Sequence, residues 1–162
     1  MTEPRDQPDF FTASLALADA DRLDVEAMKL LFRVEVSGEA FYNQLADRVG
    51  NEEAATLLRR NGREEMGHAR RIRRAISLKL GEPFEPADEM LDPFTIALPR
   101  QVGPEIFPLI VQAEIEGDAG YLRWADAETD PAVAKLLRLN AREEALHGRR
   151  VAQAAALLEA AG

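Results

Sequence analysis

Residues 54–71 read AATLLRRNGREEMGHARR, and residues 133–150 read VAKLLRLNAREEALHGRR. The two stretches lie 79 residues apart and are identical at 11 of 18 positions without a gap. A shared helical periodicity would explain the recurring leucines and alanines, but it would not put asparagine, glutamate and histidine in the same register. The repeat therefore indicates a duplicated helical unit.

The same offset relates a second pair of stretches that precede the first pair. Residues 35–42, EVSGEAFY, match residues 114–121, EIEGDAGY. Each unit thus has one segment with a lone glutamate and a tyrosine seven residues later, followed by a segment with Arg-Glu-Glu-x-x-His. We expect each unit to be a helical hairpin, and the two hairpins to pack with pseudo-two-fold symmetry.

Glycine, proline and capping residues divide the chain into long periodic segments. Asn51 and Asp130 are suited to cap helices, and Pro131 suits a first helical position. The stretch from 81 to 103 contains too many prolines to form one helix. The predicted helices span residues 22–49, 52–80, 104–128 and 131–160.

These features predict an all-α fold: a ferritin-like four-helix bundle in a single domain over residues 1–162. Short links would make antiparallel hairpins of residues 22–80 and 104–160, and a bundle whose one long crossover is residues 81–103 is of the ferritin-like type. The length of 162 residues suits one domain with a sizeable core. The sequence assigns no role to the first 20 residues or to the crossover.

Composition excludes several classes of function. The chain has no cysteine, which excludes disulfides, thiolate zinc sites and a rubredoxin-type iron centre within it. A net charge of -9 argues against a nucleic-acid partner. No basic segment precedes the first apolar stretch, as a signal peptide would require, and no apolar run reaches the ~20 residues that span a bilayer. We expect a cytoplasmic protein without a membrane span.

Helical spacing places a group of ionisable residues on the inward faces of the four helices. The group consists of Glu35, Glu65, His68, Glu114, Glu144 and His147. Four carboxylates at one level of a core would repel one another, and the inward faces offer no lysine or arginine there. Two divalent cations would balance the four charges, so the sequence predicts a two-metal site.

The spacing within this group suits metal ligation. Residues at i and i+3, as in Glu-x-x-His, share one helical face. The motif occurs twice and contains both histidines of the chain. Mixed carboxylate and imidazole ligands suit iron, manganese or a mixed pair better than zinc. Glu64 and Glu143, four residues before each histidine, either ligate or orient the imidazole; the motif spacing favours Glu65 and Glu144 as the ligands.

Other repeated side chains have two interpretations each. Tyr42 and Tyr121 either pack in the core or hydrogen-bond a ligating carboxylate and donate an electron. Trp124 is interpreted as core packing, with a redox relay as the alternative. Three arginine pairs are predicted to form a solvated face with Glu64 and Glu143, with a subunit contact as the alternative; they are Arg63/Arg142, Arg70/Arg149 and Arg71/Arg150.

The lone glutamates with their tyrosines and the paired R-E-E-x-x-H segments resemble the rubrerythrin and ferritin-like superfamily, from about residue 25 to 158. The resemblance implies two carboxylate-bridged iron ions that react with dioxygen or hydrogen peroxide. It also implies the same six ligands: Glu35, Glu65, His68, Glu114, Glu144 and His147. The chain departs from the family in having no rubredoxin domain, no fifth helix, and Gly117 where rubrerythrins usually carry a further glutamate.

These observations favour a di-iron oxidoreductase of ferroxidase or peroxidase type. Glu35 and Glu114 would be terminal ligands, and Glu65 and Glu144 would bridge the ions. Tyr42 and Tyr121 are the candidate catalytic residues. Three alternatives remain: iron storage without catalysis, hydroxylation of a small organic substrate, and a metal-free structural bundle. The electron donor is not identified, and common symmetry suggests a homodimer or a higher homo-oligomer.

Overall fold

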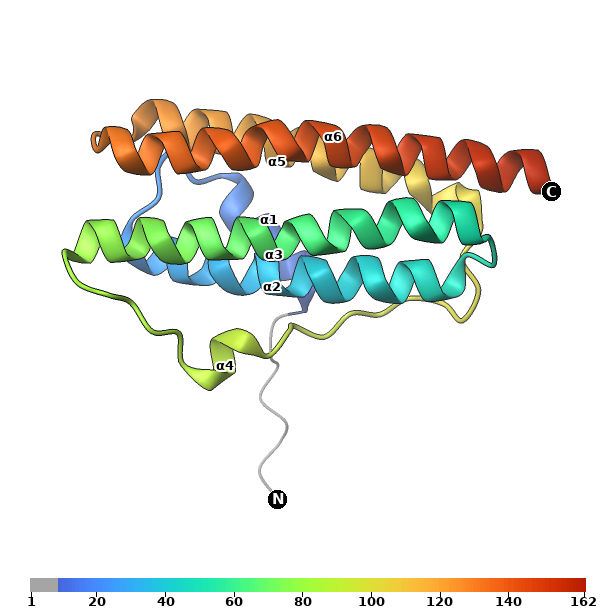
Figure 1. Ribbon diagram of the computed structural model, residues 1–162, viewed down its shortest axis with the longest axis horizontal. Coiled ribbons are helices and arrows are strands. Elements are labelled where there is room, and N and C mark those ends of the chain that lie inside the picture. Colours follow the sequence, from blue (N-terminus) through green and yellow to red (C-terminus); the bar gives the residue numbers. More distant parts are fainter. Residues whose placement is uncertain (1–8) are drawn as a thin grey trace, which may run out of the picture.

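The computed structural model describes residues 9–162 (Figure 1). Helices account for 79% of the structure and the described residues contain no strand, which confirms the predicted all-α class. The elements are α1 (Phe10–Ala18), α2 (Val25–Arg48), α3 (Glu52–Leu80), α4 (Asp88–Leu91), a 3-10 turn η1 (Pro104–Ile106), α5 (Phe107–Ala127) and α6 (Pro131–Ala161). None of these helices is both long enough and apolar enough to cross a membrane.

The four longest helices run side by side along the long axis of the molecule (Figure 1). α2 packs against α3, α5 packs against α6, and α3 packs against α6. The sequence predicted these helices closely, and α3 has the predicted bounds. α2 begins at Val25 rather than at residue 22, because the Asp24 side chain accepts a hydrogen bond from the Ala27 N–H at 2.8 Å and caps the helix there.

Local chemistry fixes the turns of the two hairpins. Asn51 caps α3 by accepting a hydrogen bond from the Ala54 N–H at 3.0 Å, and Asp130 caps α6 through the Ala132 N–H at 2.9 Å. These caps start α3 and α6 directly after short links, so the chain reverses between α2 and α3 and between α5 and α6. α3 ends at Gly81, where the crossover begins, and the φ of 73° at Gly81 is in the left-handed region that glycine adopts readily.

The crossover between α3 and α5 covers the outer side of α2. The Phe94 N–H donates to the buried Ser37 Oγ at 2.9 Å. The Val102 N–H donates to the Arg48 carbonyl oxygen at 3.0 Å. The N-terminal α1, which the sequence did not predict, lies between α2 and α5, and the Trp124 Nε1 donates to the Ala20 carbonyl at the end of this segment. Both segments thus cover the long helices.

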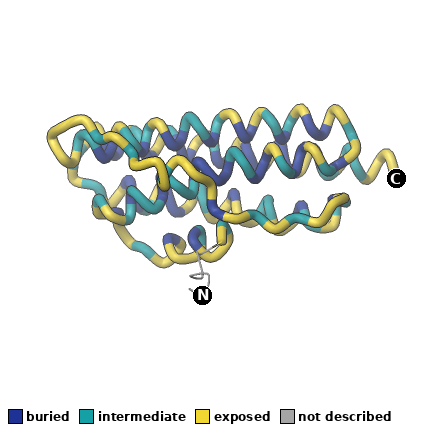
Figure 2. The backbone as a smooth tube through the Cα atoms, turned by 90° about the horizontal axis from the view of Figure 1, so that it is seen from below, coloured by how far each residue is buried: buried dark blue, intermediate teal, exposed yellow. Residues whose placement is uncertain are grey.

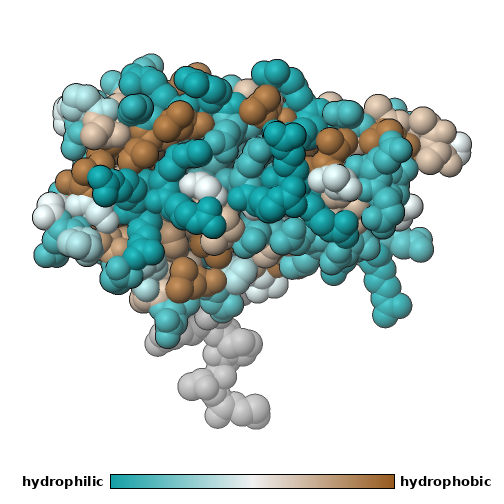
Figure 3. Space-filling model, in the orientation of Figure 1, coloured by the Kyte–Doolittle hydropathy of each residue, from teal (hydrophilic) through white to brown (hydrophobic). Residues whose placement is uncertain are grey.

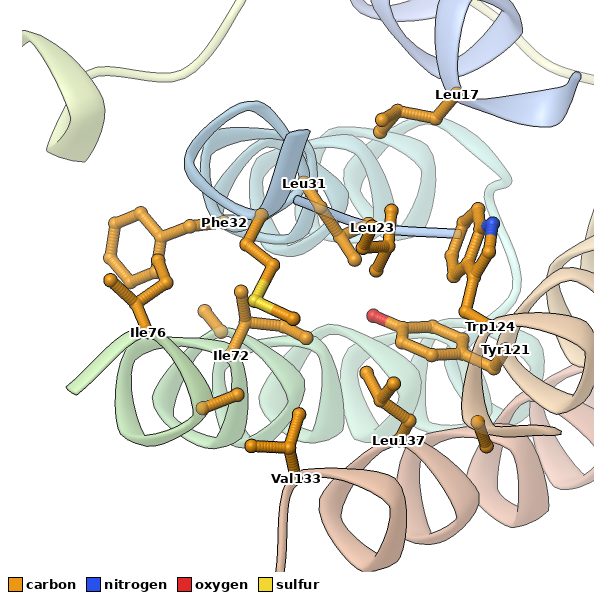
Figure 4. Packing of buried hydrophobic residues seen from close by; sticks show 14 of the residues in the cluster. Leu17, Leu23, Leu31, Phe32, Ile72, Ile76, Tyr121, Trp124, Val133 and Leu137 are labelled. Carbon is orange, nitrogen blue, oxygen red and sulfur yellow. The ribbon is translucent and has the colours of Figure 1, made fainter. Parts of the chain in front are cut away.

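All four long helices contain buried residues, which Figure 2 marks in dark blue along the backbone. They form two apolar clusters, one toward each end of the molecule. The first includes Leu31, Ile72, Tyr121 and Leu137, and Figure 4 shows them facing one another. The second includes Leu45, Leu58, Phe107 and Val151. A layer of buried polar residues separates the two clusters, and this layer contains the candidate site.

Candidate metal centre

The polar layer brings together all six residues that the sequence singled out on the inward faces. Both histidines are fully buried, and the four glutamates are between 5% and 8% exposed. The layer receives one glutamate from α2, one from α5, and a glutamate and a histidine from each of α3 and α6. These six residues are Glu35, Glu65, His68, Glu114, Glu144 and His147.

Four of the six form the tightest group. One ligand atom from each of Glu65, His68, Glu144 and His147 lies within 4.8 Å of the others. The two carboxylate oxygens of Glu65 lie 3.3 Å from the Nδ1 atoms of the two histidines, one oxygen facing each ring. The oxygens of Glu144 are arranged likewise, at 3.5 and 3.6 Å. Each of these glutamates therefore lies between both imidazoles.

Glu35 and Glu114 lie to either side of this group. A carboxylate oxygen of Glu35 is 3.5 Å from the Nδ1 atom of His68, and one of Glu114 is 3.9 Å from that of His147. Each also accepts a hydrogen bond from a tyrosine of the other hairpin: the Tyr121 hydroxyl donates to Glu35, and the Tyr42 hydroxyl donates to Glu114. The tyrosines thus hydrogen-bond the carboxylates, one of the two interpretations that the sequence allowed.

Glu64 and Glu143 occupy the opposite side of the imidazole rings. The Nε2 atom of His147 lies 3.1 Å from Glu64, and that of His68 lies 3.4 Å from Glu143. Each glutamate thus faces the histidine of the other hairpin, although the sequence spacing had associated it with the histidine of its own helix. Glu64 and Glu143 contact the Nε2 atoms, whereas the Nδ1 atoms face the carboxylates of Glu65 and Glu144, called the inner glutamates below. Glu64 and Glu143, the outer glutamates, are therefore placed to orient the rings.

Two arginines hold these outer carboxylates. Arg150 donates to both oxygens of Glu64 at 2.6 and 3.2 Å, and Arg71 donates to Glu143 at 2.6 Å. The prediction of a solvated arginine face was wrong for Arg150, which is only 9% exposed. The physical reason is that α3 and α6 pack directly against each other, so an arginine on the facing edge loses water and pairs with a carboxylate across the interface.

Two asparagines complete the layer. Asn61 donates from Nδ2 to the backbone carbonyl of His147 at 3.2 Å, and Asn140 donates to that of His68 at 3.4 Å. Their own side-chain oxygens accept hydrogen bonds from Arg150 and Arg71, each at 3.0 Å. The asparagines therefore tie α3 to α6 at the level of the polar layer.

A glycine of α2 makes room for the Glu65 carboxylate. A Cβ atom on Gly38 would lie 3.1 Å from the Cδ atom of Glu65, which is closer than an ordinary contact. At the repeat-related Gly117, a Cβ would lie 3.5 Å from the Cδ atom of Glu144, an ordinary van der Waals distance. The sequence interpretation gave Gly38 no role, although its recurrence three residues after each lone glutamate was a usable signal.

The imidazoles hold protons strongly in this environment. Burial alone would lower the pKa of both histidines, but the surrounding carboxylates outweigh it. They raise the pKa of His147 to about 10 and that of His68 well above its usual range. Burial and the charge of Glu144 would raise the pKa of Glu65, yet the two imidazoles beside its carboxylate lower it to about 2.

The pKa values of Glu35 and Glu114 are raised, in contrast to that of Glu65. Burial and the charge of Glu65 raise the pKa of Glu35 to about 8. Burial and the charge of Glu144 raise the pKa of Glu114 well above its usual range. Without a metal, the group therefore neutralises itself at neutral pH with protons on two imidazoles and two carboxyls. Cations entering the site would replace those protons.

The unsatisfied polar atoms of the layer fit a cation site. The His68 Nδ1, His68 Nε2 and His147 Nδ1 atoms are buried and form no hydrogen bond. Buried ring nitrogens are normally paired, because an unpaired polar group in a core is costly. Converging carboxylate oxygens and imidazole nitrogens are the donor set that metals such as iron, manganese and zinc accept. This buried group could therefore hold a metal ion.

Comparison with protein-family models, with curated proteins and with solved structures found no match to this chain.

Proposed function

We propose that this chain is a ferritin-like four-helix bundle that binds two iron ions and oxidises Fe(II) with dioxygen or hydrogen peroxide. The observation that carries the proposal is the position of the two buried Nδ1 atoms. Each lacks a hydrogen bond, and each lies within 3.3 to 3.6 Å of an oxygen of both Glu65 and Glu144. Two cations between these atoms would satisfy all of them.

The distances support a distinct role for each ligand. Glu65 and Glu144 would bridge the two ions, because each presents one oxygen toward each histidine. Glu35 and Glu114 would be terminal ligands, because each lies near one histidine only. His68 and His147 would ligate through Nδ1, since their Nε2 atoms face Glu143 and Glu64.

The donor set supports iron or manganese as the proposed metal. Four carboxylates and two imidazoles are the constellation of di-iron and di-manganese carboxylate bundles: a glutamate from each of two helices and Glu-x-x-His from each of the other two. Bound iron would supply the electron-transfer chemistry. The chain itself binds and orients the ions, and its two apolar clusters exclude water from the polar layer.

The tyrosines are proposed to act through the terminal ligands. Tyr42 and Tyr121 each donate a hydrogen bond to a terminal glutamate and are buried in the core. Burial raises the pKa of both phenols well above the usual range, so they remain protonated and hold the carboxylates in place. We also propose that these phenol groups donate an electron during oxidation.

Two features support the repeated-hairpin organisation. The links between α2 and α3 and between α5 and α6 are short, whereas residues 81–103 cross from one pair to the other. The contacts of the polar layer are also duplicated: the ring-to-glutamate, arginine-to-glutamate and tyrosine-to-glutamate pairs each occur once from each half. A gene duplication would produce this arrangement.

The direct test is an anaerobic titration of metal-free protein with Fe(II), counting the ions bound per chain. We expect about two ions per chain, followed by oxidation when dioxygen or peroxide is added. Glu144→Ala is expected to abolish the metal-dependent oxidation, because it removes a ligand that faces both histidines. Tyr121→Phe is expected to bind the same number of ions but to oxidise them more slowly.

Glu116→Ala is the matched control, because Glu116 is an exposed glutamate of α5 outside the polar layer. It should bind and oxidise iron as the parent protein does. Absence of Fe(II) binding by a folded parent protein would mean that the buried glutamates have a structural role. Full oxidation activity in Glu144→Ala would contradict the ligand assignment.

A further inference from the structure

The outward surfaces of α3 and α6 form a strongly basic face on an acidic protein. From residue 54 to 78 of α3, the exposed residues are Thr56 and four arginines. From residue 134 to 153 of α6, no exposed residue is acidic and most are cationic. This basic face consists of Arg60, Arg63, Arg70, Arg74, Lys135, Arg138, Arg142 and Arg149. Since the whole chain carries a net charge of -9, positive charge is concentrated here.

Most of the cations on this face have no internal partner. Arg60 pairs with Glu64, and Arg138 pairs with Asp126. The other six members of the basic face form no salt bridge with any residue from 9 to 162. Two repeat-related pairs, Arg63/Arg142 and Arg70/Arg149, are among these six. Their charges therefore remain available to an external anionic surface.

The basic face lies directly outside the candidate metal centre. Glu64 and Glu143 emerge between α3 and α6, with side chains that are 24% and 23% exposed. Each of them also contacts a buried imidazole: a carboxylate oxygen of Glu64 lies 3.1 Å from the Nε2 atom of His147, and one of Glu143 lies 3.4 Å from that of His68. One carboxylate and one imidazole thus connect this surface to the inner glutamates on each half of the molecule.

Figure 3 shows the face on which α6 and α3 lie toward the viewer. Strongly hydrophilic side chains surround smaller hydrophobic patches on it. Leu146, which is 36% exposed, lies on α6 between Arg142 and Arg149. A charged surface with small apolar contacts is typical of transient protein encounters, in which charge guides the approach and the contact area stays small.

We propose that the basic face docks a small acidic protein that carries single electrons. The inference rests on the proposed function, which leaves ferric ions that must be reduced before another cycle. Each carrier would lose one electron and each ferric ion would gain one, so two carriers restore two ferrous ions without any group transfer. The chain has no cysteine and thus no iron–sulfur centre of its own to supply these electrons.

The charge distribution favours a small protein over a polyanion as the occupant. A compact carrier would contact only the basic face, whereas an extended nucleic acid would also approach the acidic remainder of a chain with net charge -9. The path for an electron from the basic face to the candidate metal centre is also short, because Glu64 and Glu143 contact the imidazoles directly. Docking elsewhere on the molecule would not bring a carrier to these two carboxylates.

The test is a calorimetric titration of the metal-free chain with an oxidised plant-type [2Fe–2S] ferredoxin, a small acidic one-electron carrier. Binding is expected at about 20 mM salt and should weaken at least about tenfold near 300 mM, because salt screens exposed charges. The double variant Arg63→Glu, Arg142→Glu should weaken binding by at least about tenfold at low salt, since it places like charges opposite each other.

The matched control is the double variant Arg22→Glu, Arg100→Glu, which changes the net charge equally at two exposed arginines outside α3 and α6. It should change the affinity by less than about twofold. The proposal would be overturned if the two double variants lost affinity for ferredoxin equally. It would also be overturned if the parent chain bound ferredoxin independently of salt, or did not bind it. Tighter binding to a short DNA duplex would overturn it too, as would a dimer of the parent chain that Arg63→Glu, Arg142→Glu converts to a monomer.

Electron delivery is tested separately on the iron-loaded chain. Reduced ferredoxin should reduce the oxidised centre, and the Arg63→Glu, Arg142→Glu variant should slow this step while reduction by neutral duroquinol is unchanged. If duroquinol reduces the centre and bound ferredoxin does not, the proposed route is wrong. If neither reduces it, the proposed redox function fails, a result distinguishable from the binding data on the metal-free chain.

Discussion

At the scale of single residues, Gly38 controls how closely α2 approaches the Glu65 carboxylate. In Gly38→Ala, the added methyl group would lie 3.1 to 3.3 Å from three atoms of the Glu65 side chain, so the carboxylate must shift. We expect the folded structure to persist, because the atoms in contact belong to the end of a side chain. The affinity for Mn(II), measured by calorimetry, should fall by about tenfold.

Gly67→Ala is the matched control on α3. No atom lies within 4 Å of a Cβ placed there, so the substitution should leave the affinity unchanged. It should also stabilise the fold by about 0.5 to 1 kcal/mol, because alanine favours the helix more than glycine does. If the two variants bound Mn(II) equally well, Gly38 would have no role in positioning Glu65.

The sequence predicted which residues meet in the polar layer better than it predicted their pairing. The repeat and the inward spacing singled out His68 and His147 and the four glutamates around them, because both signals can be read along the sequence without knowing how the helices pack. Which glutamate faces which Nε2 atom depends on how α3 and α6 pack. Glu64 therefore contacts His147 rather than His68, a relation that spacing along one helix does not contain.

At the scale of elements, the two halves of the molecule differ in what covers them. Ser37 of α2 receives the Phe94 N–H of the crossover, whereas the equivalent residue of α5 is the exposed Glu116. Ser37→Ala leaves that buried N–H without an acceptor, which should lower the free energy of unfolding by about 1 to 3 kcal/mol. Urea unfolding and hydrogen exchange at the Phe94 amide would measure the effect.

Thr56→Ala serves as the control for Ser37→Ala. The Thr56 hydroxyl is exposed and donates to a carbonyl within its own helix, so its loss should change stability by less than about 0.5 kcal/mol. An unchanged exchange rate at the Phe94 amide in Ser37→Ala would show that the crossover is held by its other contacts, such as the hydrogen bond from Val102 to Arg48.

Helix boundaries followed from the sequence at several capping residues, but the Asp24 cap that starts α2 and the whole of α1 were missed. Asn51, Gly81 and Asp130 set the observed ends of α3 and the start of α6. α1 has nine residues, a length that is marginal for a helix on its own in water. Its packing against α2 and α5 stabilises it, and no local pattern carries that information.

At the scale of the whole molecule, the polar layer couples the stability of the fold to pH. His147 has a pKa of about 10 in the fold and Glu35 one of about 8, both above the ordinary pKa values of 6.5 and 4.5 that these groups have in an unfolded chain. Between pH 6.5 and 8, the metal-free fold therefore retains protons that the unfolded chain has lost. Stability falls as pH rises in this window, because deprotonation then favours the unfolded state.

The expected slope is a loss of about 1.4 kcal/mol per pH unit for each proton that only the fold retains. Metal-free protein should thus unfold at a lower urea concentration at pH 8 than at pH 6.5. Glu65, with a pKa lowered to about 2, has the opposite effect only below its unfolded value and does not contribute in this window. Bound Mn(II) should remove the decline, because it replaces the protons.

Glu35→Gln separates the contribution of one carboxyl from that of the imidazoles. Glutamine resembles the protonated acid, so the variant should lose the part of the pH dependence that belongs to Glu35 and keep the part that belongs to His147. The measurement is urea unfolding of the parent and the variant at pH 6.5 and 8, with a chelator and with Mn(II). A metal-free parent whose stability stayed constant or rose over this window would show that protons do not neutralise the four buried glutamates.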